Sequence, residues 1–273
     1  MNKKLFNKIL LSIILTFSLM LVSSCSIIKN LKKSIVNEIR NEYVEYEQNI
    51  TVEDIEDALE VGTEIAKSCT VGVKVESKNF ITTSSSTGSA VIVKKESHGD
   101  DTYTYTAITN RHVTGVNSST TRQVYLGNNI FVNAVLVGYD NEYDLAVIKF
   151  TTGILLNVAK LYTDEVKVGS FAIAVGSPYD LQGFFNTVTL GIISATHRQY
   201  RDEDVNGNEI VNEFIQHDAA INSGNSGGGL FDIYGRLIGI NTWKIASDLS
   251  DDYEGLNFAI PSKEIVNRFS KYL

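Results

Sequence analysis

From about residue 70 onward, short apolar segments follow one another, and this pattern limits the fold more than any other feature. Side chains alternate at a spacing of two, as they do on one face of a β-strand. Turn-forming residues separate the segments, and no helical crossover alternates with them, which argues against a parallel α/β sheet. A dozen short strands indicate an all-β barrel or sandwich. The predicted strands are Val71–Val75, Ser89–Val93, Tyr103–Ile108, Gln123–Leu126, Ile130–Val137, Leu145–Phe150, Phe171–Val175, Thr187–Ser194, Glu213–Gln216, Gly229–Ile233, Leu237–Ile240 and Leu256–Ile260.

Two helices are predicted to flank these strands. Thr51 and Asp54 have the spacing of a capping box, which begins a helix over residues 51–68. A second helix is expected over Lys263–Lys271, after the last strand. Within the strand region, Asn128–Asn129 is typical of a hairpin turn. The sequence therefore predicts an all-β domain with one helix at each end.

Residues 1–24 have the order of a secretory signal: positive residues, an apolar run from Ile9 to Val22, and then small residues. This run of 14 residues is short for a membrane-spanning helix, which needs about 20. The segment Leu21–Cys25 resembles the lipobox of bacterial lipoproteins, in which the cysteine becomes the first mature residue and carries a diacylglycerol. The resemblance implies a lipid anchor on Cys25 at the outer face of the bacterial cell membrane. An ordinary cleaved signal of a secreted protein and a spanning signal-anchor are the alternatives.

The net charge limits the classes of binding partner, and the cysteine count limits the disulfides that can form. Without residues 1–24, which carry three lysines and no acidic residue, the net charge falls from −8 to −11. An acidic chain without a basic cluster argues against nucleic-acid binding. Cys69 is the only cysteine besides Cys25, so no disulfide within the chain is expected, and its apolar neighbours indicate a small buried strand residue. Residues 25–50 are predicted to be a tether or linker, and residues 51–273 the folded domain.

The segment Gly224-Asn225-Ser226-Gly227-Gly228 is the strongest chemical signal in the chain. Its glycines allow a sharp backbone turn that exposes the Ser226 hydroxyl and points neighbouring N–H groups at one spot. Acyl transfer needs both a nucleophile and donors to the oxyanion of the tetrahedral intermediate. A phosphate-binding loop would require a lysine after the glycine, and none follows here. Taken alone, the segment is also compatible with a plain turn.

A serine nucleophile needs a base, and the chain has four histidines. His98 lies in a predicted surface turn, and His197 lies in a polar stretch before two arginines. His217 precedes Asp218 inside a predicted strand, where neighbouring side chains point to opposite faces. These three are predicted to be solvated or structural. His112 differs because it follows the end of a predicted strand, where catalytic groups are usually held.

An orienting carboxylate is expected beside this histidine. Asp144 opens the apolar strand Leu145–Phe150, where it could be buried against the imidazole of His112 and fix its tautomer. Asp140 and Glu142 are nearby rivals, but they lie in a predicted turn and should be more solvated.

Three ordered segments now support a family assignment. Thr109–Val113, Asp144–Lys149 and Asp218–Gly228 resemble the His, Asp and Ser motifs of the trypsin-like fold, and most closely those of the HtrA (Deg) family. Gly239–Thr242 and Asn257–Ser262 match later signatures of that family. The similarity covers roughly residues 68–265. It implies two six-stranded antiparallel β-barrels, the first over about 68–155 and the second over about 160–262, with the site between them.

The resemblance also implies an activity. His112, Asp144 and Ser226 would be the catalytic triad of a serine endopeptidase, and the N–H groups of Gly224 and Ser226 would form the oxyanion hole. Polypeptide substrates, in particular unfolded or exported proteins, are implied, and no cofactor is required. No zinc-binding His-Glu-x-x-His motif or cysteine pair is present, so no metal is expected. The alternative is a catalytically idle binding or chaperone-like surface lipoprotein that keeps the fold.

Finer expectations follow from the family pattern. Ala220, Ile221 and Asn241 fall at specificity-pocket positions and predict a small to medium apolar residue before the cut. Arg198 falls where the family carries an arginine in an activation-sensing loop, although a solvated loop arginine is equally compatible.

Departures from the family pattern are also visible. Gly229 stands where Pro is usual, and His217 where Thr is usual. The sequence ends one helix after the expected barrel, so we expect no PDZ domain. Trimers are common in the family, which makes a homo-oligomer compatible with the resemblance.

Overall fold

The structure is a computed structural model that describes residues 29–30, 32–37, 51–78, 83–203, 209–242 and 255–273. The chain divides into two units, Met1–Glu56 and Asp57–Leu273. In the first unit, residues 29–30 and 32–37 are helical and exposed. The predicted signal sequence and the lipid-attachment residue Cys25 lie outside the described residues. Among the described residues, no helix is both long enough and apolar enough to cross a membrane.

The predicted capping box begins helix α2, which spans Val52–Ser68. The N–H of Asp54 donates to Thr51 Oγ1 at 3.1 Å, and the N–H of Thr51 donates to Asp54 Oδ2 at 2.7 Å. These two bonds satisfy backbone donors that the first helical turn leaves without partners. The helix start predicted from the sequence is therefore confirmed.

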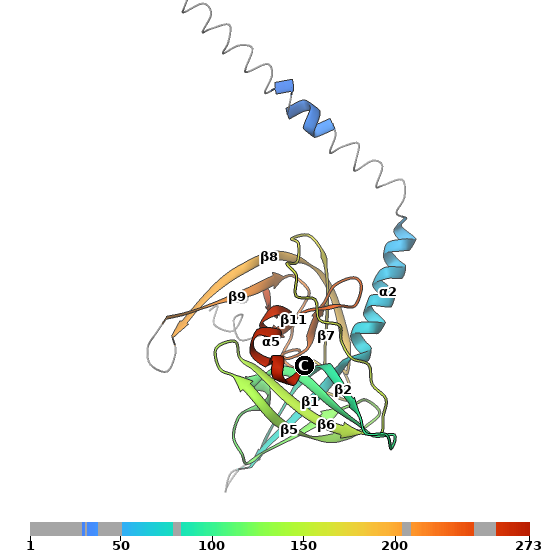
Figure 1. Cartoon of the computed structure of the whole chain (residues 1–273), viewed down its shortest axis with the longest axis vertical. Coiled ribbons are helices and arrows are strands. Elements are labelled where there is room, and N and C mark those ends of the chain that lie inside the picture. Colours follow the sequence, from blue (N-terminus) through green and yellow to red (C-terminus); the bar gives the residue numbers. More distant parts are fainter. Residues whose placement is uncertain (1–28, 31, 38–50, 79–82, 204–208, 243–254) are drawn as a thin grey trace, which may run out of the picture. The chain divides into compact units, whose positions relative to one another are not determined.

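The second unit contains two closed antiparallel barrels of six strands each, which confirms the predicted fold (Figure 1). The first barrel has the strand order β1-β2-β3-β6-β5-β4. Its strands are β1 (Thr70–Lys78), β2 (Thr83–Ser97), β3 (Tyr103–Asn110), β4 (Thr120–Tyr125), β5 (Phe131–Asp140) and β6 (Leu145–Thr152). A four-residue helix, α3 (Arg111–Thr114), directly follows β3.

The second barrel has the strand order β10-β11-β12-β9-β8-β7. Its strands are β7 (Phe171–Gly176), β8 (Thr187–Glu203), β9 (Glu209–His217), β10 (Gly229–Phe231), β11 (Leu237–Thr242) and β12 (Asn257–Pro261). Helix α5 (Ser262–Phe269) and the 3-10 turn η1 (Ser270–Tyr272) follow β12. The short terminal helix that the sequence predicted is thus present.

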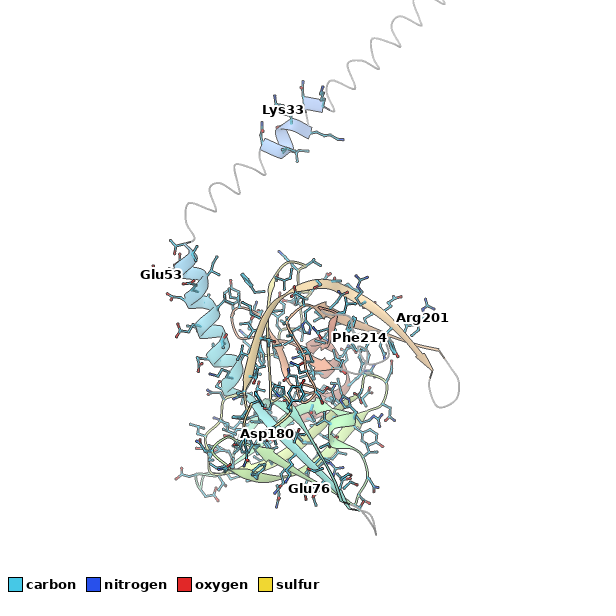
Figure 2. The ribbon with its side chains drawn as sticks, turned by 180° about the vertical axis from the view of Figure 1, so that it is seen from behind. Lys33, Glu53, Glu76, Asp180, Arg201 and Phe214 are labelled. Atoms are coloured by element: carbon cyan, nitrogen blue, oxygen red, sulfur yellow. The ribbon has the colours of Figure 1, made fainter. Side chains whose placement is uncertain are left out.

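Strands β8 and β9 are longer than predicted. They extend as a paired hairpin from the barrel, with pairing as far as Glu203 and Glu209 (Figure 1). Figure 2 shows Phe214 among the packed side chains and Arg201 farther along this hairpin. The outer part is held by main-chain pairing between residues 199–203 and 209–213. The sequence of these two segments does not alternate regularly between apolar and polar residues, which is the pattern by which strands are recognised.

One apolar cluster joins the two barrels and the C-terminal helix. It contains Val91, Ile108 and Leu145 of the first barrel and Ile173, Phe231 and Ile240 of the second, all at most 1% exposed. Ile265 and Phe269 of α5 pack into the same cluster. Because this core is shared, the loops at the ends of β3, β6 and β9 are held at defined positions in one packed unit.

Cys69 is buried, as predicted, but it lies between α2 and β1 instead of within a strand. Its thiol donates to the carbonyl oxygen of Ala66 at 3.3 Å. Burial raises the pKa of Cys69 to about 12. The thiol therefore stays protonated at neutral pH and is a structural group.

Candidate active site

Two neighbouring strands of the first barrel carry the predicted base and its carboxylate. His112 lies in α3 directly after β3, and Asp144 directly precedes β6. Strands β3 and β6 pair along their whole length, with Asn110 opposite Leu145 at the end. The two predicted residues therefore meet at the same end of the same strand pair.

His112 and Asp144 contact each other in two ways. The backbone N–H of His112 donates to Asp144 Oδ1 at 3.0 Å, and His112 Nδ1 contacts Asp144 Oδ2. Since a carboxylate accepts hydrogen bonds, this contact assigns the proton to Nδ1 and leaves Nε2 as the basic nitrogen. The side chain of Asp144 is 6% exposed, whereas that of His112 is 39% exposed. A buried carboxylate thus orients an accessible imidazole.

Further contacts hold Asp144 itself. Its carbonyl oxygen accepts the N–H of Arg111 at 2.8 Å and Asn110 Nδ2 at 3.2 Å. Arg111 Nε also lies 3.7 Å from Asp144 Oδ1. The rivals Asp140 and Glu142 both pair with Arg268 and have no described contact with His112. Of the three acidic candidates, the structure brings Asp144 to the histidine.

Ser226 lies in the loop between β9 and β10, within the predicted glycine-rich segment. Gly224 has a φ of +99° and Gly227 a φ of +83°, which side chains disfavour. A β-carbon on Gly224 would lie 2.6 Å from the carbonyl oxygen of Ser177, and one on Gly227 would lie 2.2 Å from that of Ser89. Both glycines are therefore required by conformation and by space, and they place Gly224 and Ser226 in one tight loop.

Strand β2 brings the serine loop and the histidine helix together. A β-carbon on Gly88 would come within 2.5 Å of Val113 Cγ1 and 3.2 Å of the Ser226 carbonyl oxygen. The N–H of the next residue, Ser89, donates to that same carbonyl at 3.0 Å. Ser226 and Val113, the residue that follows His112, thus both approach Gly88.

Ser89 was missed by the sequence analysis. It is fully buried, and its Oγ donates to the Gly224 carbonyl oxygen at 2.9 Å while accepting the N–H of Ser177 at 2.9 Å. Its own carbonyl oxygen accepts Thr109 Oγ1 at 2.6 Å. The residue therefore fixes the carbonyl groups of both Gly224 and Ser226. A polar residue between Gly88 and the apolar run Ala90–Val93 is the signal that could have indicated it.

The predicted specificity residues occupy different environments. Ala220 is exposed and Ile221 is half-buried between β9 and the serine loop. Asn241 is fully buried, and its Nδ2 donates to the Gly229 carbonyl oxygen at 2.9 Å. Its backbone bonds to Gly227 and Gly228. Asn241 thus holds the backbone of the serine loop and of the start of β10, and it also pairs with Ala259 of β12.

The other predicted residues lie away from the histidine–aspartate pair. Arg198 lies in strand β8 and not in a loop, and its Nε donates to Gln216 Oε1 at 2.8 Å. The prediction of a loop at Arg198 is wrong because β8 continues to Glu203, beyond the predicted end of this strand at Ser194. His98 is exposed and contacts Thr104 Oγ1 at 2.8 Å, and His197 contacts Glu213 and Glu165.

His217 is fully buried at the end of β9, and its ring lies close to the backbone of Ala219 and the side chain of Asn241 without a hydrogen bond of good geometry to either. Burial, which penalises the charged form, lowers its pKa from the ordinary value to about 4. The ring is therefore neutral at physiological pH, and it has no access to solvent. These properties fit a structural residue and not a general base.

Comparison with known proteins agrees with this geometry. A family model described as a trypsin-like peptidase domain matches residues 88–240, more than half of the chain. The chain is 46% identical over 190 residues to a serine protease Do-like HtrA of Lactococcus lactis subsp. cremoris, covering 68% of this chain and 45% of that protein. It is 41% identical over 169 residues to a probable periplasmic serine endoprotease, DegP-like, of Buchnera aphidicola subsp. Baizongia pistaciae, covering 61% and 33%. The chain thus spans less than half the length of these two relatives.

Among solved structures, an HtrA-type protease with a tripeptide is similar in fold. Its TM-score is 0.58 at 34% sequence identity, with 77% of this chain and 61% of that chain covered.

Proposed function

Because the chain belongs to the family of trypsin-like peptidase domains, we propose that it acts as a serine endopeptidase of the HtrA type. The observation that carries this proposal is the pairing of a buried carboxylate, Asp144, with the imidazole of His112. Helix α3, which carries His112, and the glycine-rich loop of Ser226 both approach Gly88 of β2, which supports the proposal. Residues 51–273 would form the protease domain.

The proposed reaction proceeds by acyl transfer. Ser226 Oγ attacks the carbonyl carbon of the scissile peptide bond while His112 Nε2 takes its proton. The oxyanion that forms accepts hydrogen bonds from the N–H groups of Gly224 and Ser226. Collapse of this intermediate breaks the C–N bond, His112 returns the proton to the leaving amine, and an acyl-enzyme remains. Water, deprotonated by His112, then releases the acid product.

Asp144 has a supporting part in this mechanism. It accepts the Nδ1 proton of His112, which keeps Nε2 directed to the nucleophile and stabilises the imidazolium when it forms. Because Asp144 is held by its backbone contacts, it needs no rearrangement during the reaction. No cofactor enters any step.

Substrates and location are proposed from the resemblance and from the names of the relatives. We infer that unfolded or exported polypeptides are cleaved after small to medium apolar residues, with Ala220 and Ile221 lining the pocket. The named periplasmic relative supports activity outside the cytoplasm. A lipid anchor on Cys25 would hold the enzyme at the membrane. Fatty-acid labelling of the wild type, and its loss in Cys25→Ala, would test the anchor separately from catalysis.

The decisive test of the activity compares the wild type with Ser226→Ala. We expect the wild type to react with a fluorophosphonate probe and to hydrolyse casein, and Ser226→Ala to lose both, with kcat lowered by about 10⁶-fold and folding unchanged. Ser170→Ala, a change at an exposed serine, is the matched control and should keep both activities. A folded wild type that neither labels nor hydrolyses peptides under any condition would favour an idle, binding form of the fold.

A further inference from the structure

The turn before Asp144 is held by parts of the chain that lie far away in sequence. Asp144 itself has a φ of +56°, in the left-handed region that a non-glycine residue keeps only when its surroundings hold it there. The four preceding residues are Asp140, which ends β5, and 141–143, which lead toward β6. The position of the Asp144 carboxylate therefore depends on what fixes this turn.

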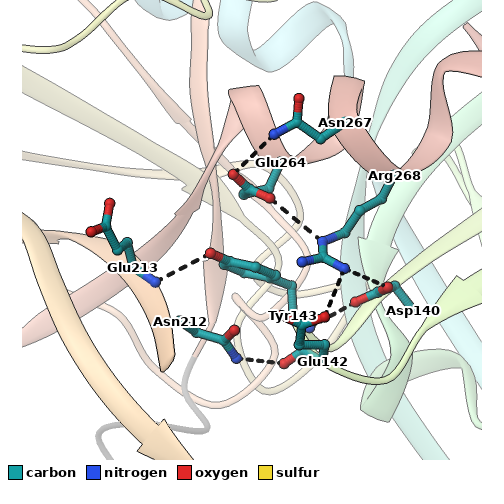
Figure 3. A network of polar contacts seen from close by, with 8 residues as sticks. All are labelled: Asp140, Glu142, Tyr143, Asn212, Glu213, Glu264, Asn267 and Arg268. Atoms are coloured by element: carbon teal, nitrogen blue, oxygen red, sulfur yellow. Dashed lines mark hydrogen bonds and ion pairs between the residues drawn. The ribbon is translucent and has the colours of Figure 1, made fainter. Parts of the chain in front are cut away.

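Strand β9 of the second barrel provides the first set of contacts, which Figure 3 shows. Asn212 Nδ2 donates to the Glu142 carbonyl oxygen at 2.7 Å. The N–H of Glu213 donates to the Tyr143 hydroxyl at 3.2 Å. Asn212 is 3% exposed and Tyr143 is 7% exposed, so these bonds are shielded from water.

Helix α5 provides the second set through one side chain, Arg268 (Figure 3). Its Nη1 donates to Asp140 Oδ2 at 2.9 Å and to Glu142 Oε2 at 3.1 Å. Its guanidinium lies over the Tyr143 ring, 4.4 Å from the centroid. Arg268 thus contacts three of the four residues of the turn.

Asp140 links Arg268 to the backbone next to Asp144. One of its oxygens binds Arg268, and the other accepts the N–H of Tyr143 at 2.8 Å. Tyr143 is joined to Asp144 by a single peptide bond. Glu264 Oε2 also lies 3.5 Å from Arg268 Nε, so one cation faces three carboxylates. Without that cation, Asp140 and Glu142 would repel each other within the turn.

We propose that Arg268 is a positioning residue for catalysis: through Asp140 and Tyr143 it holds the turn that presents Asp144 to His112. This inference rests on the proposed peptidase function. Arg268 has no described contact with His112 or Ser226, so it acts only through the turn. The C-terminal helix then contributes to the alignment of the catalytic carboxylate as well as to the core.

The test compares Arg268→Gln with Arg236→Gln. Arg236 is a close match, because its guanidinium lies 4.2 Å from the centroid of the Tyr162 ring and its Nη2 pairs with Asp232 at 2.6 Å. Its side chain is 31% exposed, against 21% for Arg268. Each variant removes one stacked, ion-paired arginine, but only Arg268 touches the Asp144 turn.

We expect Arg268→Gln to lower kcat by about 10- to 100-fold with little change in KM, because a small displacement of the carboxylate misorients the base. The low-field proton signal of His112 Nδ1–H, seen by nuclear magnetic resonance, should shift or broaden. Arg236→Gln should change kcat by less than about twofold and leave that signal in place. Each kcat is calculated from the concentration of active sites titrated with the fluorophosphonate probe, so unfolded protein does not affect the value.

A double variant tests whether Arg268 acts on the turn through Asp140. If Arg268 acts through Asp140, then Asp140→Asn combined with Arg268→Gln should lose no more activity than the larger single loss, since both changes break one connection. Arg268→Lys keeps the charge but not the planar fork, and its kcat should lie between those of Gln and wild type.

Two outcomes would overturn the proposal. One is a wild-type kcat and an unchanged low-field signal in Arg268→Gln. The other is an equal loss in Arg268→Gln and Arg236→Gln, which would indicate general destabilisation. Either result leaves the peptidase function intact, because that function is tested by the activity of the wild type against Ser226→Ala.

Discussion

Ser89 illustrates how much a single small side chain contributes to the candidate site. Its hydroxyl donates to the Gly224 carbonyl oxygen and accepts the N–H of Ser177, while its backbone N–H donates to the Ser226 carbonyl oxygen. The peptide groups that would stabilise the oxyanion are part of the loop that it fixes. At this scale, preorganisation of the loop depends on a hydroxyl that lies in the other barrel.

Ser89→Ala should therefore lower kcat by at least about tenfold, because a loose loop no longer directs its N–H groups at the oxyanion. Unfolding free energy should fall by about 1–3 kcal/mol, since two buried polar groups lose their partner. Ser262→Ala is the control: that serine is also fully buried, and its Oγ donates to the Leu237 carbonyl oxygen at 2.8 Å. It should cost similar stability and keep kcat within about twofold. Equal activity of the two variants in a peptide assay would contradict the loop-fixing role.

His217 predicts how stability depends on pH. Its pKa of about 4 in the folded protein lies below the ordinary value, so the unfolded chain binds the extra proton first as the pH falls. The free energy of unfolding should thus have its full value above about pH 6.5. It should fall by about 3 kcal/mol toward pH 4 because of His217. Denaturant unfolding of wild type and His217→Thr at several pH values measures the difference. Parallel curves for the two proteins between pH 7 and pH 4 would show that His217 does not account for it.

At the scale of elements, the loop between β9 and β10 is shaped by close approach as well as by turn conformation. Asn128 and Asn129, in contrast, form a hairpin turn with φ values of +50° and +62°, and the dipeptide alone predicted it. The serine loop packs Gly227 against Ser89 of β2, a strand that is distant in the chain. The conformation of the serine loop therefore depends on its own glycines and also on strand β2.

Gly227→Ala and Gly99→Ala separate conformation from packing. The two glycines have nearly equal φ values, +83° and +80°, but a β-carbon on Gly99 would meet nothing within 4 Å. We expect Gly99→Ala to cost about 1 kcal/mol and to keep activity. Gly227→Ala should cost about 3 kcal/mol or more and abolish most hydrolysis, because the Ser89 carbonyl must move. Thermal unfolding and peptide hydrolysis measure both effects. Similar stability losses in the two variants would mean that the backbone φ angle, and not the contact with Ser89, sets the requirement for glycine.

For the molecule as a whole, the shared core determines how the domain unfolds. Each barrel has an apolar cluster of its own, and a third cluster contains residues of both barrels and of α5, so loss of packing in either barrel disrupts the shared cluster. The unit Asp57–Leu273 should therefore unfold in a single transition, as expected for one cooperative core.

Ile265→Ala tests this coupling from the C-terminal helix. Ile265 is fully buried in α5, and its truncation should cost about 2–5 kcal/mol. Activity, near-ultraviolet circular dichroism and far-ultraviolet circular dichroism should still change together on heating, at a lower temperature. Val135→Ala, at a position that is 60% exposed in β5, should stay within about 0.5 kcal/mol of wild type. Separate transitions for activity and secondary structure would indicate barrels that unfold independently.

The sequence alone determined the twelve strands, the helix cap at Thr51, and the three segments that carry His112, Asp144 and Ser226. These features depend on side-chain period, on turn residues and on motifs, all of which are local in the chain. The extension of the β8–β9 hairpin escaped prediction because its outer part depends on main-chain pairing and its sequence has no regular alternation of apolar and polar residues.

Only the tertiary structure showed the contact of Asp144 with His112, the contact of Ser89 with the serine loop, and the contact of Arg268 with the Asp144 turn. Each depends on segments more than 30 residues apart, the separations being 32, 135 and 128. Hydrogen bonds of this kind have no periodic signature, since their partners are selected by the packing of two barrels against each other. The local pattern therefore supplies the chemical groups, and the packing of distant segments sets their geometry.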